Sequence, residues 1–202
     1  MILALAGLVG GASAQVVFEN PWDPNASDAG AFSQGNQLVA GEFDLASGAT
    51  VALASWHGTM FSADPLDTGD TWNFDVVFWS NSGGQPGAEI SRQSVVADVT
   101  DTGLNIAGER VYEFEASFTG VTLSGSTTYF FSVENTGTQN TFRWNIGTDA
   151  AYSGWFTNDS GGSWNDLGPD NREPLNFRLS VPAPASMALL GLGGLAAFRR
   201  RR

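Results

Sequence analysis

The chain contains no cysteine and no lysine, and His57 is its only histidine. Without cysteine it can form no disulfide, no thiolate nucleophile and no cysteine-ligated metal site. A single histidine also excludes metal sites built from several imidazoles. Stability must therefore come from a hydrophobic core and not from covalent cross-links or a structural zinc site.

Basic charge is scarce in most of the chain. All 21 acidic residues lie between Gln15 and Ser180, but only five of the nine basic residues do, which gives this segment a net charge of −16. Such a surface repels nucleic acid and anionic lipid headgroups and favours solubility. We therefore expect no nucleic-acid partner. The length of the segment suits one domain with a sizeable core.

The first 14 residues form an apolar stretch, MILALAGLVGGASA, that ends in Ala12-Ser13-Ala14. Small residues at the first and third places of this triplet suit the pocket of signal peptidase. We expect residues 1–14 to be a signal peptide, with cleavage after Ala14. The acidic segment that follows would then be exported.

The last part of the chain, residues 181–202, has three parts in a fixed order. A break, Val181-Pro182-Ala183-Pro184, precedes an apolar run of 14 residues, Ala185–Phe198. As a helix this run would rise about 21 Å against a hydrocarbon core of about 30 Å, which is short for a permanent anchor. The chain closes with a cluster of arginines: Arg199, Arg200, Arg201 and Arg202. Such a cluster stays on the cytoplasmic side of a membrane, so residues 15–180, which we call the body, would lie on the opposite side.

This three-part tail resembles the PEP-CTERM sorting signal of Gram-negative bacteria, which a membrane protease of the exosortase type recognises. One position departs from the family pattern, because Ala183 stands where the family has glutamate. The resemblance implies an exosortase partner and a short hydrophobic helix that anchors the chain transiently in the inner membrane. It further implies delivery to the cell surface or the extracellular matrix.

The body alternates apolar and polar residues with a period of two, which is typical of strands with one buried face. The clearest segments are Thr71–Ser80, Glu109–Phe118, Thr127–Glu134, Thr141–Gly147 and Glu173–Val181, and weaker ones are Gln37–Leu45, Ala49–His57 and Glu89–Asp98. Glycine-rich turns separate them, and no segment has a helical period. Residues 15–180 should therefore form an all-β, antiparallel two-sheet β-sandwich, jelly-roll-like in topology, in which each sheet has one covered face.

The body also resembles the β-sandwich ectodomains that often precede PEP-CTERM tails. The motifs that carry this resemblance are Trp56-His57-Gly58, Phe74–Trp79 with the following Ser-Gly-Gly-Gln-Pro-Gly, Tyr112-Glu113-Phe114, Thr128–Phe131 and Asn176–Leu179. The resemblance implies a fold and a surface context, and it supplies no catalytic residue.

Candidate catalytic residues are few. His57 is the one available imidazole base, but no Gly-x-Ser-x-Gly nucleophile elbow accompanies it, so we expect a packed residue at the end of a strand. Glu113 and Glu115 project from one face of a strand, and glycoside hydrolysis needs a pair of carboxylates beside a groove. They leave open an alternative function as a secreted glycoside hydrolase or polysaccharide lyase. Two outward acids on a strand are more often a solvated face, and we expect no enzyme activity.

Asp64, Asp67 and Asp70 stand three residues apart in one loop. Carboxylate oxygens that converge from a loop are the ligands calcium prefers, and extracellular calcium can fill weak sites. The spacing does not match the helix-loop-helix calcium pattern, and aspartates are also common in turns. We therefore expect no cofactor, with calcium at this loop as the one candidate.

Seven tryptophans are many for a body of this size. Trp79, Trp155 and Trp164 fall on the polar side of a strand or in glycine-rich loops, where an exposed indole could offer its face to a sugar ring. Alternatively, these side chains cap the core. We therefore expect a non-enzymatic structural or adhesive module of the cell surface or matrix, with extracellular polysaccharide as its candidate ligand.

Overall fold

The computed structural model describes residues 14–26, 30–33, 37–61, 72–136, 141–159, 161–167 and 174–182. All secondary-structure elements assigned within these ranges are β-strands, so the all-β prediction is confirmed. The strands are β1 (Gln15–Asn20), β2 (Ala31–Phe32), β3 (Leu38–Leu45), β4 (Ala49–Phe61), β5 (Trp72–Ser82), β6 (Gln85–Ile106), β7 (Glu109–Leu123), β8 (Thr127–Asn135), β9 (Thr141–Trp144), β10 (Gly154–Thr157), β11 (Asn165–Asp166) and β12 (Phe177–Val181). No helix able to span a membrane occurs among the described residues. The predicted signal peptide up to Ser13 and the predicted C-terminal helix lie outside them.

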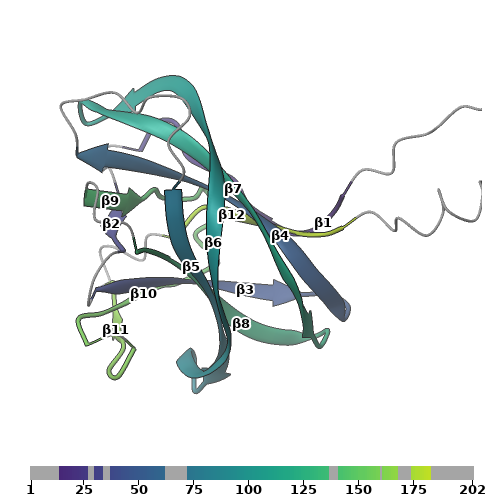
Figure 1. Ribbon diagram of the computed structural model, residues 1–202. Coiled ribbons are helices and arrows are strands. Elements are labelled where there is room, and N and C mark those ends of the chain that lie inside the picture. Colours follow the sequence, from purple (N-terminus) through teal and green to yellow (C-terminus); the bar gives the residue numbers. More distant parts are fainter. Residues whose placement is uncertain are drawn as a thin grey trace, which may run out of the picture.

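All strand pairs are antiparallel, as predicted, and they form one continuous sheet in the order β1-β12-β4-β7-β6-β5-β8-β3-β10-β11. Strand β6 is 22 residues long and joins the two halves. Its first part pairs with β5 up to Ala97, and its second part pairs with β7 from Asp98 onward. The sheet thus curls so that its halves face each other (Figure 1). The sandwich consists of one folded sheet, because β6 continues from one layer into the other.

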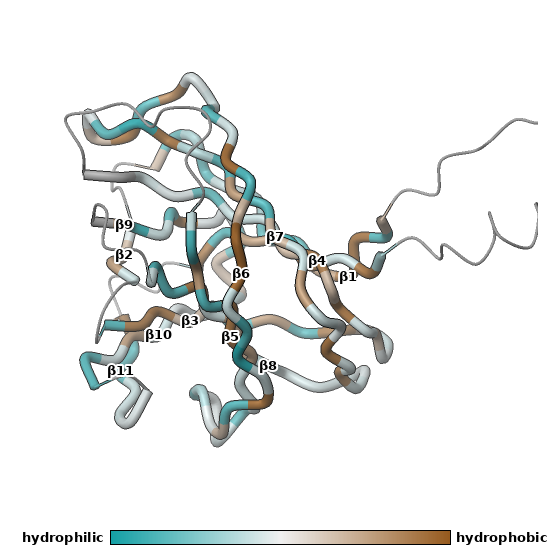
Figure 2. Tube along the Cα trace, viewed as in Figure 1, coloured by the Kyte–Doolittle hydropathy of each residue, from teal (hydrophilic) through white to brown (hydrophobic). Residues whose placement is uncertain are grey.

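The core lies between the two halves and is strongly aromatic. Trp56 of β4 stacks on Phe114 of β7, with ring centroids 5.8 Å apart and planes at 11°, and meets Phe74 of β5 edge-on at 5.1 Å. Aromatic pairs of this kind contribute about 0.5–1.5 kcal/mol each beyond their buried area. The predicted inward faces of Thr71–Ser80 and Glu109–Phe118 are confirmed, and Figure 2 shows the alternation of apolar and polar residues along these strands.

The sequence-based prediction that each sheet has only one covered face is wrong for the half that contains β5, β8 and β3. A second apolar cluster lies on the outer side of these strands: Leu38, Ala40, Val77, Trp79 and Phe130. Trp155 of β10 and Trp164, just before β11, pack against it. This half of the sheet is therefore covered on both sides, because a later part of the chain lies over its outer face.

Strands β1 and β12 pair along the edge of the first half. Gln15 lies opposite Val181, and Asn20 lies opposite Phe177. The beginning of β1 and the end of β12 are consequently side by side (Figure 1). The predicted signal-peptidase site and the start of the predicted sorting motif therefore leave the domain at one point, on hydrogen-bonded neighbours.

Candidate functional site

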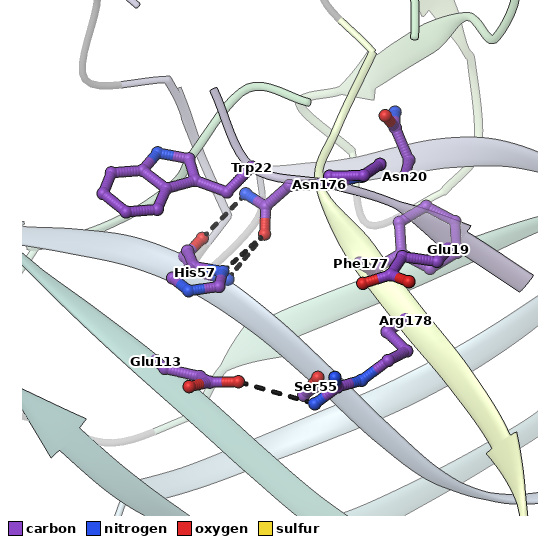
Figure 3. A pocket seen from close by; sticks show the side chains of 10 residues that line it. Glu19, Asn20, Trp22, Ser55, His57, Glu113, Asn176, Phe177 and Arg178 are labelled. Carbon is purple, nitrogen blue, oxygen red and sulfur yellow. Dashed lines mark hydrogen bonds and ion pairs between the residues drawn. The ribbon is translucent and has the colours of Figure 1, made fainter. Parts of the chain in front are cut away.

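A small pocket lies on the outer face of β1, β12, β4 and β7 (Figure 3). Its volume is about 50 Å³, and its lining is rich in polar side chains. The lining residues are Glu19, Asn20, Pro21, Trp22, Ser55, His57, Glu113, Asn176, Phe177 and Arg178. Residues far apart in the sequence thus meet at one place on the sheet.

Strand register explains why these side chains converge. Arg178 of β12 lies opposite Glu19 of β1 on one side and opposite Ser55 of β4 on the other. Two residues farther along β4, His57 lies opposite Glu113 of β7. Because side chains alternate across a strand, the residues between them enter the core and these face outward. The pocket is therefore built on the sheet itself, which holds its walls rigidly.

Asn176 anchors the pocket floor and is 1% exposed. Its Oδ1 accepts a hydrogen bond from the backbone N–H of His57 at 2.7 Å. Its Nδ2 donates to the carbonyls of His57 at 3.2 Å and of Asn145 at 2.7 Å. The amide thus replaces part of a backbone ladder between β4 and the segment after β9, and its orientation is fixed by these bonds.

The same amide sets the tautomer of His57. The Nδ1 of His57 lies 3.3 Å from Asn176 Oδ1, an acceptor, so Nδ1 carries the proton and Nε2 is the acceptor. Trp22 stacks on the imidazole, with centroids 4.9 Å apart and planes at 19°. Burial lowers the pKa of His57 from its ordinary value of 6.5 and outweighs Glu113 and the Asn176 hydrogen bond, which raise it. The ring is therefore neutral at pH 7.

This lowered pKa predicts a pH-dependent stability. The unfolded chain takes up the His57 proton below pH 6.5 more readily than the folded chain does. The contribution of His57 should be complete above that value and should be lost as pH falls through the lower, folded-state pKa. We expect urea unfolding to show a larger loss of stability between neutral and mildly acidic pH in the wild type than in His57→Asn, which has no imidazole. Equal losses in both proteins would refute this role.

The charged groups of the pocket are only loosely paired. The Arg178 Nη2 and Glu113 Oε1 atoms are 3.6 Å apart, beyond ordinary hydrogen-bond length, and both side chains are 37% exposed. Glu19 is exposed and has no ion-pair partner within the described ranges. Each group therefore keeps hydrogen-bonding capacity for a ligand or for water.

The structure brings the three predicted sugar-binding tryptophans together, but not as an open platform. Trp79 is 4% exposed, and its Nε1 donates to Ser132 Oγ at 2.9 Å. Trp164 packs edge-on against it, with centroids 5.3 Å apart. The expectation that Trp79 is exposed is wrong, because its side of β5 is covered by Trp155 and Trp164. Sugar binding by those two half-buried residues stays a prediction.

The candidate calcium ligands Asp64, Asp67 and Asp70 lie outside the described residues, so that site stays a prediction. Within the ranges that the structure describes, no three histidine or acidic side chains are grouped as metal ligands would be. Asp159 instead shows the turn-forming role of aspartate. Its Oδ1 accepts bonds from the backbone N–H groups of Gly162 and Ser163, both at 2.9 Å. These bonds, after that from the Thr157 hydroxyl, lower the pKa of Asp159.

Of the two carboxylates that suggested a hydrolase, Glu113 and Glu115, only one lies in the pocket. Glu113 lines the pocket, whereas Glu115 is exposed farther along β7 and is not part of the lining. His57 lies in the interior of β4, not at a strand end as we expected, and it is tied to the Asn176 amide. Ser55 shares its strand face, but among the described residues no hydrogen bond joins the two side chains.

The sequence did not single out Trp22, Glu19 and Arg178 as site residues. The alternation in Glu173–Val181 contained one signal, because Asn176 and Arg178 fall on its polar face. The sequence contained no such signal for Trp22 and Glu19, because only the pairing of β1 with β12 brings them close to β4.

One comparison with known families gives a match at the C-terminal end. Residues 180–202 match the model of the PEP-CTERM protein-sorting motif. The chain carries a PEP-CTERM sorting signal. The match begins one residue before the predicted boundary and includes Val181, Pro182, Ala183, Pro184 and the four arginines, so alanine at position 183 does not prevent it. No curated protein is significantly similar to the chain.

The PEP-CTERM signal establishes the chain as an exported protein that an exosortase-type membrane protease sorts through its C-terminal segment. The match overlaps the last two residues of β12, Ser180 and Val181. The predicted signal peptide, residues 1–14, stays a prediction.

Proposed function

We propose that this PEP-CTERM protein is a non-enzymatic structural or adhesive module of the cell surface or extracellular matrix that binds neutral carbohydrate. The observation that carries the proposal is the sorting signal joined directly to the last strand of a rigid β-domain. A rigid domain delivered outside the cell, with a strongly acidic body, suits a soluble matrix component.

The pocket supports a binding role more than catalysis. The amide of Asn176 orients His57, and among the described residues no carboxylate is hydrogen-bonded to the imidazole as in a catalytic triad, although Glu113 lies nearby. Glu115 lies outside the pocket that Glu113 lines. A glycoside hydrolase or lyase is the competing function, because Glu19 and Glu113 are two acids beside one cavity.

The sorting step can be tested in the cells that make the protein. Replacing Arg199 to Arg202 with serine should abolish processing, because the charged stop of the signal is lost. We expect mass spectrometry to find the uncut tail on the variant and a new C-terminus on the wild-type surface protein. A second variant, with lysine at all four positions, keeps the positive charge and shows whether the protease recognises charge alone or arginine itself. If the serine variant were still processed like the wild type, the proposed sorting would be contradicted.

The binding step needs a separate assay. The full chain, kept in a detergent without a sugar headgroup, should bind neutral glycans on an array and release no product from them. Turnover that is lost in Glu113→Gln or Glu19→Gln would instead establish the hydrolase or lyase. An absence of both binding and turnover would leave sorting intact and refute the carbohydrate part.

A further inference from the structure

We propose that the pocket between Trp22, His57, Glu113 and Arg178 is the sugar subsite of this protein and that it takes two neighbouring hydroxyl groups of a neutral pyranose. This inference rests on the proposed carbohydrate-binding function and gives it a location that differs from the predicted tryptophans.

The charged groups of the pocket disfavour an anionic ligand. Glu19 and Glu113 outweigh Arg178, the only side chain of the lining with a full positive charge, because His57 is neutral. A metal ion is disfavoured for another reason, because the described residues offer no set of three metal ligands here. A ligand without net charge that forms hydrogen bonds meets neither obstacle.

Hydrogen-bonding capacity in the pocket matches hydroxyl groups. His57 Nε2 is an acceptor, and the Glu113 carboxylate accepts as well. Arg178 donates, and the separation of 3.6 Å from Glu113 leaves both groups able to bond to a ligand. A hydroxyl both donates and accepts, so a vicinal diol can satisfy these groups together. A peptide group has only one N–H to offer an acceptor-rich site.

The pocket is small and open to solvent on the outer face of the sheet. With a volume of about 50 Å³ it has room for hydroxyl groups, since about 10–15 Å³ measured in this way holds one water molecule, and the rest of a pyranose ring can stay in solvent. One edge of a ring would enter beside the part of Trp22 that lines the pocket, since one face of this indole is already stacked on His57. Because the groups stand on paired strands and Asn176 fixes His57, little ordering is needed on binding.

The tryptophan cluster on the other half of the sheet has the opposite character. Its members pack against each other and against apolar side chains of β3, β5 and β8. Among the described residues, the indole nitrogens of Trp155 and Trp164 are buried without a hydrogen-bond partner, and so is that of Trp22 in the pocket. This cluster covers the sheet, whereas the pocket presents polar groups to solvent.

The test follows the seven indole N–H signals by NMR in the full chain, in a detergent without a sugar headgroup. The probes are the methyl glycosides of glucose, galactose and mannose up to about 100 mM, because single-sugar sites bind at millimolar strength. N-methylacetamide serves as the peptide-group probe. The signal of Trp22 is assigned by its loss in Trp22→Phe. We expect at least one glycoside to shift the Trp22 signal in a saturable way, and N-methylacetamide to leave it unchanged.

Two variants on the same face of β7 provide the matched comparison. Glu113→Ala should weaken the glycoside about tenfold or more, because a hydrogen bond to a charged group is lost. Glu115→Ala should change affinity less than about twofold, since that residue is outside the pocket. Both variants should keep the remaining indole spectrum, which reports that they fold.

Three results would overturn the inference. Shifts at Trp155 or Trp164 with Trp22 unchanged would place the sugar site elsewhere and leave the proposed carbohydrate binding standing. A response to N-methylacetamide alone would indicate a peptide ligand. No response to any glycoside would refute the subsite, and the glycan array would then decide separately whether the protein binds carbohydrate at all.

Discussion

The free energy of unfolding of Asn176→Ala should be about 3 kcal/mol below that of the wild type. The substitution leaves the backbone N–H of His57 without its acceptor. The C=O groups of His57 and Asn145 each lose one bond but still accept from the backbone N–H groups of Asn145 and Asn176, respectively. Each buried group left unsatisfied costs about 1–3 kcal/mol, and this site is enclosed between β4, β12 and the segment after β9. Urea unfolding followed by tryptophan fluorescence measures the difference.

Two further variants separate hydrogen bonding from packing at this position. Asn176→Asp keeps the shape and the acceptor but has no N–H to donate, so it should also be destabilised. Asn105→Ala removes an exposed asparagine from β6 and should change stability by no more than about 0.5 kcal/mol. If Asn176→Ala lost less than about 1 kcal/mol, the amide would not be the structural link that we describe.

Phe114→Ala should lower the free energy of unfolding by about 4 kcal/mol. The ring is fully buried at the centre of the core and contacts aromatic rings from both halves of the sheet: Trp56, Trp72, Phe74 and Phe142. Its removal leaves a cavity that these large rings cannot fill without leaving their own contacts. The same urea titration provides the measurement.

Phe118→Ala is the matched control on the same strand and the same face. Phe118 is only partly buried and contacts Phe78, with centroids 5.7 Å apart. Its loss should cost about 2 kcal/mol or less, because less apolar surface is removed from water contact and solvent can reach the space. Equal losses for the two variants would contradict the assignment of Phe114 to the centre of the core.

The strand pattern could be predicted from the sequence because alternation is a local property. Phe74, Val76 and Phe78 stand two residues apart, and a strand turns them to one face whatever the rest of the chain does. The same holds for Tyr112 and Phe114 of β7. The sorting signal was equally local, since the break, the apolar run and the arginines follow each other directly and their order carries the information.

The covered outer face of β5 and β8 could not be predicted in this way. Val77 and Phe130 are apolar on the supposedly solvated side, and this was the available signal. What covers them is Trp155 and Trp164, which are distant in the sequence. Whether an indole is exposed depends on which segment lies over it, and alternation along one strand contains no such information.

By itself, the sequence determined an exported, all-β, antiparallel protein with an acidic surface and a PEP-CTERM sorting signal. Tertiary structure alone decided that one sheet curls through β6, that Trp79 is buried and that Glu19, His57, Glu113 and Arg178 meet in a pocket. The physical reason is register. Local alternation determines which face a side chain takes, whereas its neighbours on that face are set by hydrogen-bonded pairing between strands far apart in the chain.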